Sequence, residues 1–167
     1  MFREMRRKKQ VLSREESIEV LNRGSAGVLA VTGDEDYPYA VPISYVYYNN
    51  KILLHSARSG HKVDALVKNP KVSFCVIDEN QIVPEEYTTY FRSVIVFGKA
   101  HFIEDDIEKR KTLEILTEKY SGQMSKEHMA AAIDKEIKAL IMIEIEIEHL
   151  SGKEAIEFVR AKQKKVD

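Results

Sequence analysis

A short polar turn within the stretch 51–69, KILLHSARSGHKVDALVKN, contains residue types that could bind an anion. It follows an apolar run and precedes a segment whose apolar residues recur at helical spacing. Such a turn points backbone N–H groups and cationic side chains at one place, as a phosphate requires. The turn matches no strict motif, so an ordinary exposed connection remains the alternative. The candidate phosphate ligands are Ser56, Ser59, Gly60, His61 and Lys62.

His55 lies at the end of the predicted strand beside this turn, where an imidazole could act as a proton donor. A buried, hydrogen-bonded histidine is the alternative interpretation. The remaining histidines lack the spacing of metal ligands, and we predict no metal site. The sequence also lacks a Walker loop, a Rossmann G-x-G-x-x-G motif and a nucleophile elbow.

A second polar group, TTYFRS at 88–93, begins a long segment of β-forming residues. Strand alternation would place Tyr90 and Arg92 on one face, with Phe91 and Ser93 on the other. These side chains could flank a planar ring and its phosphate. Cross-strand packing, with Arg92 paired to a carboxylate, explains the same pattern.

The elements that must position these residues are mainly strands. A capping box, Ser13 with Glu16, predicts the start of the first helix. Pro42 suggests an edge, bulge or kink, and Gly98 a bulge or bend. Alternating isoleucines and glutamates after 140 predict a strand with one face on a core and one in water, rather than a metal site. The predicted strands are 26–32, 38–48, 51–56, 71–77, 88–103 and 140–150; the predicted helices are 14–22, 61–68, 105–120 and 126–138; and 78–86 is a predicted polar loop.

This order of elements predicts an antiparallel barrel, closed or partly closed, with peripheral helices. The 167 residues are enough for one domain. With 26 basic and 27 acidic residues, charge gives no reason to expect a nucleic-acid or membrane partner, although both ends are basic. Cys75 is the only cysteine, which excludes an intrachain disulfide. The N-terminus is too charged for a signal peptide and the longest apolar run too short to span a bilayer, so we expect a cytoplasmic protein.

Several short segments, in a fixed order over nearly the whole chain, form a recognisable set. They are MRRK at 5–8, GVLA at 27–30, YPYAVPISY at 37–45, LHSA at 54–57, GHK at 60–62, YFRSVIVFG at 90–98 and SGK at 151–153. The set resembles the pyridoxamine 5′-phosphate oxidase-like, FMN-binding split-barrel superfamily. Within that superfamily it is similar to the nitroimidazole-resistance (5-nitroimidazole reductase-like) branch.

The resemblance implies a mainly β (α+β) fold, a six-stranded antiparallel split β-barrel with peripheral helices. It implies one FMN-binding domain over 1–167, with a basic N-terminal arm (1–12) and a C-terminal tail (151–167), and a homodimer with FMN at the subunit interface. By position, the flavin-ring edge would contact Pro42, Ile43, Ser44 and Tyr45, and the ring and ribityl chain would contact His55, Ser56 and Ala57. The phosphate would be held by Gly60, His61 and Lys62. A neighbouring strand would contribute Tyr90, Arg92 and Ser93, and the partner subunit would contribute Lys153.

The activity that the resemblance implies is an FMN-dependent oxidoreductase with His55 as the catalytic residue. Its electron acceptors would be small nitroaromatic, nitroimidazole or quinone-like compounds. The absence of tryptophan and of a C-terminal arginine–histidine pair argues against vitamin B6 oxidation. One alternative is a non-catalytic protein that binds or senses flavin, haem or F420 on the same barrel. A cofactor-free protein whose basic ends contact nucleic acid ranks last, because the net charge is −1.

Overall fold

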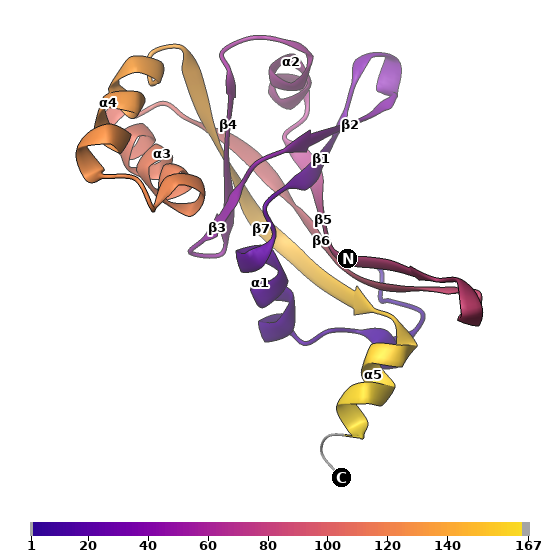
Figure 1. The fold of residues 1–167 in the computed structure, drawn as a ribbon. Coiled ribbons are helices and arrows are strands. Elements are labelled where there is room, and N and C mark those ends of the chain that lie inside the picture. Colours follow the sequence, from indigo (N-terminus) through magenta and orange to yellow (C-terminus); the bar gives the residue numbers. More distant parts are fainter. Residues whose placement is uncertain (1, 165–167) are drawn as a thin grey trace.

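The computed structural model describes residues 2–164 and shows an antiparallel sheet curled on itself, with helices around it (Figure 1). The strand order is β2-β1-β5-β6-β7-β4-β3. The strands are β1 (Gly27–Thr32), β2 (Pro38–Ile43), β3 (Val46–Tyr48), β4 (Lys51–Ala57), β5 (Lys71–Val83), β6 (Thr88–Ile103) and β7 (Leu140–Glu154). The helices are α1 (Arg14–Arg23), α2 (His61–Lys68), α3 (Asp106–Ser121), α4 (Lys126–Glu136) and α5 (Ile156–Gln163), and η1 (Lys8–Gln10), η2 (Asp34–Asp36) and η3 (Pro84–Glu86) are short 3₁₀ turns.

The two edges of the sheet explain why it curls. β2 and β3 are the edge strands, yet only Ser44 and Tyr45 separate them in the chain. A connection of two residues can join opposite edges only if the sheet curls until those edges lie near each other. This is the split barrel that the sequence predicted, and Pro42 lies on an edge strand, as expected.

Two predicted elements have different bounds in the structure. The single strand predicted over 38–48 is two strands, which makes seven in the described residues rather than six. The polar loop predicted over 78–86 is wrong for its first part, since β5 continues to Val83 and pairs there with Thr88. Cross-strand hydrogen bonds therefore extend a polar sequence that has little strand propensity of its own. The Gly98 bulge is confirmed by a register shift after Phe97.

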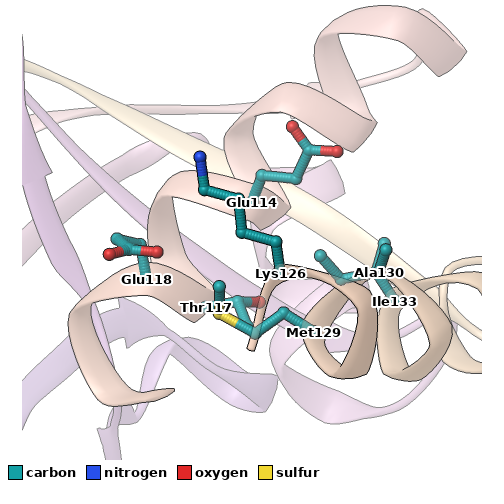
Figure 2. Close-up of a pocket in the computed structure, with 7 residues that line it drawn as sticks. All are labelled: Glu114, Thr117, Glu118, Lys126, Met129, Ala130 and Ile133. Atoms are coloured by element: carbon teal, nitrogen blue, oxygen red, sulfur yellow. The ribbon is translucent and has the colours of Figure 1, made fainter. Parts of the chain in front are cut away.

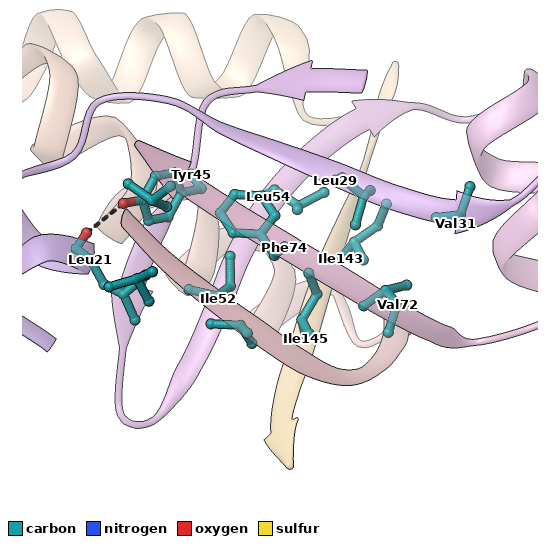
Figure 3. Close-up of a cluster of buried hydrophobic side chains, with 14 of the residues drawn as sticks. Leu21, Leu29, Val31, Tyr45, Ile52, Leu54, Val72, Phe74, Ile143 and Ile145 are labelled. Carbon is teal, nitrogen blue, oxygen red and sulfur yellow. Dashed lines mark hydrogen bonds between the residues drawn. The ribbon is translucent and has the colours of Figure 1, made fainter. Parts of the chain in front are cut away.

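The barrel interior holds the main hydrophobic core, drawn in Figure 3. A second cluster lies outside the barrel, where α3 packs on β4 and β7 and α4 packs on α3. Leu140 and Met142 are buried in this cluster, whereas Ile143 and Ile145 face the barrel core. The expectation that one face of β7 lies in water is therefore wrong for the first residues of the strand, because both faces are covered there. It holds farther along, where Glu146 is exposed.

Candidate functional site

The turn between β4 and α2 forms a hollow of about 290 Å³. The residues that line it come from the end of β4, the turn, the start of α2 and one position on β2. The structure thus brings together the predicted phosphate ligands, His55 and Ala57. The lining residues are Tyr39, His55, Ser56, Ala57, Ser59, Gly60, His61, Lys62 and Val63.

Gly60 gives the turn its shape. Its φ of 123° and ψ of 169° belong to a region that is essentially restricted to glycine. A Cβ at this position would meet nothing within 4 Å, so the requirement is for backbone conformation rather than for space. The Gly60 carbonyl accepts from the N–H groups of Val63 and Asp64. The N–H groups of His61 and Lys62, one step earlier in the helix, have no intrahelical acceptor and suit an anion.

The electrostatics of the hollow favour a negative ligand. Burial lowers the pKa of Lys62. Burial, and then the charge of Lys62, lowers the pKa of His55. A phosphate beside Lys62 would offset the burial of its ammonium and the positive charge that His55 feels. At pH 7 the His55 ring is neutral, so it carries one N–H donor and one acceptor nitrogen.

His61 is fixed by contacts outside the turn. Its ring stacks on Tyr39, with centroids 4.2 Å apart and an interplanar angle of 17°. Its Nε2 lies 3.7 Å from a carboxylate oxygen of Asp34, which also pairs with Lys68 at 3.2 Å. These contacts join α2 to β2 and η2, and they orient the first residue of the helix.

The residues predicted for the flavin-ring edge do not share one surface. Pro42 and Ser44 are exposed, and Ile43 turns toward the barrel core. Tyr45 is fully buried: its hydroxyl donates to the Leu21 carbonyl at 2.7 Å, drawn dashed in Figure 3. The backbone N–H of Tyr45 donates to the Tyr120 hydroxyl at 2.9 Å, and that hydroxyl donates to the Tyr45 carbonyl at 2.8 Å. The predicted flavin contact of Tyr45 is therefore not supported by its position.

Tyr90, Arg92, Ser93 and Lys153 lie far from the turn. His55 pairs with Met142, which pairs with Ile103, eleven residues along β6 from Arg92. At roughly 3.3 Å per residue, the path along β6 between these two positions is about 36 Å long. One copy of the chain therefore cannot bring these residues and the turn to one ligand.

Arg92 is engaged in an ion-pair network. Its guanidinium lies 3.0 Å from Asp78 and 3.2 Å from Glu154, whose side chain is 3% exposed. It also lies over the ring of Phe158, at 4.7 Å from the centroid. Arg23 and Lys162 supply further cations to the same two carboxylates. The structure thus agrees with the alternative interpretation of Arg92, pairing with carboxylates.

The other three residues of this group have separate contacts. The Tyr90 hydroxyl donates to Glu86 at 2.8 Å. Ser93 and Lys153 are paired neighbours on β6 and β7, and they are half-buried. The Lys153 ammonium lies 5.2 Å from the centroid of the Phe91 ring.

Comparison with known proteins identifies the family. A model of the pyridoxamine 5′-phosphate oxidase family matches residues 13–154. The chain belongs to this family. An uncharacterized protein of Rhizobium meliloti (strain 1021) is 37% identical over 90 residues, which is 54% of this chain and 54% of that protein. The chain therefore matches about half the length of that curated relative.

Solved structures share the fold. A protein of Bacteroides thetaiotaomicron assigned to 5-nitroimidazole antibiotic resistance is 26% identical, with a TM-score of 0.72 over 86% of this chain and 85% of that one. An FAD-binding protein of Mesorhizobium loti is also 26% identical, with a TM-score of 0.62 over 87% and 97%. A hypothetical protein of Mycobacterium tuberculosis, 21% identical, has a TM-score of 0.77 over 90% of both chains. The resemblance read from the sequence is confirmed.

The residues at the turn fit the phosphate of a cofactor of this family. They offer two helix N–H groups, the Ser59 hydroxyl and the Lys62 ammonium around one small hollow.

Sequence reasoning missed Tyr39, which lines the hollow and stacks on His61. Alternation along β2 could have shown that Tyr39 shares a face with Val41, but not that α2 returns beside it.

A separate hollow of about 320 Å³ lies between α3 and α4 (Figure 2). It contains none of the predicted site residues, and its lining mixes Glu114, Glu118 and Lys126 with apolar side chains. Within residues 2–164, no three histidine, cysteine, aspartate or glutamate side chains gather as a metal site. No helix in that part of the chain is long and apolar enough to cross a membrane.

Proposed function

We propose that this protein binds FMN as a homodimer and reduces small nitroaromatic, nitroimidazole or quinone-like compounds. The observation that carries the proposal is the hollow at the β4–α2 turn, where Gly60, Lys62 and the free helix N–H groups converge. Family membership supports a flavin, and relatives include an FAD-binding protein and one assigned to nitroimidazole resistance. FMN needs one terminal phosphate site, which the turn offers.

The size of the hollow argues for a second surface. At about 290 Å³ it is at the lower limit of small-molecule pockets, and it is open to solvent. It has room for the phosphate and part of the ribityl chain. The isoalloxazine ring must then lie on the rim, beside His55 and Ala57, with its other face covered by a second copy of the chain.

An apolar strip on the outside of the barrel supports dimerisation. Val28, Cys75 and Ile95 are neighbours across β1, β5 and β6. Ile77 and Phe97 extend the strip, and their exposed fractions are 62% and 38%. A connected strip of exposed apolar side chains is typical of an interface. A second copy packed on this strip would bury it and supply the missing cover for the flavin.

The chain's own residues would act as follows. The α2 N–H groups, Ser59 and Lys62 hold the phosphate and so fix the position of the ring. The neutral His55 ring carries an N–H on one nitrogen at pH 7 and can donate a hydrogen bond to a group bound at the rim. When bound, FMN supplies the redox chemistry.

The test is the absorption spectrum of the purified protein, before and after incubation with FMN and removal of free cofactor. We expect bound flavin, bleaching under an anaerobic reductant, and recovery of the oxidised spectrum when a nitroaromatic compound is added. A protein that retains no flavin would refute the proposal. Retained flavin that no nitro or quinone acceptor reoxidises would instead support the non-catalytic alternative.

A further inference from the structure

Two hollows continue around the β4–α2 turn from the proposed phosphate site. One, of about 390 Å³, is lined by Arg58, Asp106, Lys109, Arg110, Ile137 and Lys138. The other, of about 370 Å³, is lined by Arg58, Val63, Val67, Phe102, Glu104, Asp106, Lys109 and Ile141. They have Arg58, Asp106 and Lys109 in common, and Val63 also lines the hollow at the turn. The three hollows therefore adjoin one another.

Lys109 lines both of these hollows, and 7% of the surface of the whole residue is exposed. Within residues 2–164 its ammonium has neither a carboxylate at ion-pair distance nor a hydrogen-bond acceptor, although Arg110 and Lys111 beside it both have partners. In the same part of the chain, no side-chain nitrogen that is fully buried lacks a partner. The Lys109 ammonium must therefore open into the hollows.

The buried stem of Lys109 holds its unpaired ammonium at the edge of both hollows, where an anion could reach it. Lys109 also lies in the first turns of α3, where the helix dipole is positive and repels a cation. An anion in the hollows would satisfy the ammonium and would favour that end of the helix.

The charges that line the first hollow also favour an anion, whereas in the second hollow Glu104 and Asp106 balance Arg58 and Lys109. Arg58 is exposed, and its only hydrogen bond in the described residues is to the Lys138 carbonyl, at 3.4 Å. Lys138 adds another cation to the first hollow, where Asp106 is the one carboxylate among the described lining residues. Arg110 is less available, because it pairs with Glu114 and Asp134.

We propose that the first of these hollows forms an anion subsite that binds a phosphate or pyrophosphate group through Lys109 and Arg58. The group could belong to a dinucleotide whose other phosphate occupies the α2 turn, or to a separate phosphorylated ligand. The chemistry of recognition is the same in both cases. The subsite does not depend on the proposed flavin function, since it can be tested with pyrophosphate alone.

The experiment is calorimetric titration of the full chain with inorganic pyrophosphate. Lys109→Met keeps the aliphatic stem and removes the charge, and we expect its affinity to fall by about tenfold or more, as for the loss of one charge-assisted hydrogen bond. Arg58→Gln, at an exposed position, should weaken binding without affecting folding. Lys111→Met is the matched control on the same helix, and its affinity should stay within about twofold of wild type, as for an exposed charge.

Titrations with FMN and FAD distinguish the sources of the phosphate. If Lys109→Met weakens FAD and leaves FMN unchanged, the subsite binds the second phosphate of the flavin cofactor. If it weakens pyrophosphate and neither flavin, the ligand is a separate phosphorylated compound. The proposal is overturned if the wild type does not bind pyrophosphate, or if Lys109→Met and Arg58→Gln bind it as the wild type does. Failure of FMN binding alone would refute only the flavin proposal.

Discussion

Replacing Arg92 by glutamine separates the two roles that its sequence context allows. In the structure, Arg92 is a structural cation that joins β6 to β5 and β7 through Asp78 and Glu154. The side chains of these carboxylates are only 8% and 3% exposed. We therefore expect Arg92→Gln to destabilise the fold and to leave the intrinsic affinity for FMN unchanged.

The expected loss follows from the contacts. Arg92 makes two charge-assisted hydrogen bonds to buried carboxylates, and breaking a buried ion pair costs about 3–5 kcal/mol. Arg23 and Lys162 still neutralise Asp78 and Glu154 after the substitution, which places the cost at about 3 kcal/mol. Arg110→Gln is the matched control: Arg110 also pairs with two carboxylates, but the side chains of Glu114 and Asp134 are 52% and 63% exposed, so the cost should be about 1 kcal/mol or less.

Urea unfolding measures this difference. The chain has no tryptophan and eight tyrosines, so tyrosine fluorescence and circular dichroism are the probes. Arg23 and then Arg92 lower the pKa of Asp78 below its ordinary 3.8. The stabilisation that accompanies this shift is present above pH 3.8 and is lost as pH falls through the folded-state pKa, so the variant and wild type should converge in acid. An Arg92→Gln protein of unchanged stability and weakened FMN binding would refute the structural role.

Three further predictions concern the turn and the core. Lys62→Met should weaken FMN binding by about tenfold or more in a fluorescence titration, and Lys68→Met, exposed on the same helix, should not. Lys62→Met should also raise the pKa of His55, measured by NMR titration, because the charge of Lys62 lowers it; an unchanged or lower value would contradict the electrostatic reasoning. Tyr45→Phe removes the hydrogen bond to Leu21 and should cost about 1 kcal/mol of stability with FMN affinity intact; weaker FMN binding would restore the sequence-based role of Tyr45.

Elements specified by local sequence were predictable. The Ser13–Glu16 capping box is present at α1, with both of its hydrogen bonds. Asn49 and Asn50 adopt positive φ in the hairpin before β4. Gly60 is the N-cap of α2, and the turn lies between a strand and a helix, as the local pattern indicated. In each case the physical cause lies within a few residues, where a capping side chain or a tolerated backbone conformation decides the structure.

Elements specified by distant contacts were not predictable. The break between β2 and β3 is stabilised by Tyr120, which lies 75 residues after Tyr45 in the chain. The Tyr120 hydroxyl forms hydrogen bonds with both the N–H and the carbonyl of Tyr45. The segment YPYAVPISY does not reveal that Tyr45 is buried with its polar groups all hydrogen-bonded, because Tyr45 there continues an apparent strand. The same applies to α5, predicted as part of a basic tail; Lys162 on this helix pairs with Glu16 and Glu154.

The distance between the two predicted halves of the site decides how a shared cofactor site could be built. About 36 Å of β6 separates the turn from Ser93 and Arg92, so the second half can act on a cofactor at the turn only from another copy of the chain. Arg92 is already paired with two carboxylates, and releasing it would remove one of the two cations that each of them contacts. Ser93 and Lys153 carry no such cost, because they adjoin the apolar strip on the outer face of the sheet. A flavin site that spans two copies would therefore use Ser93 and Lys153 of the second copy, while Arg92 keeps the strands beneath them in place.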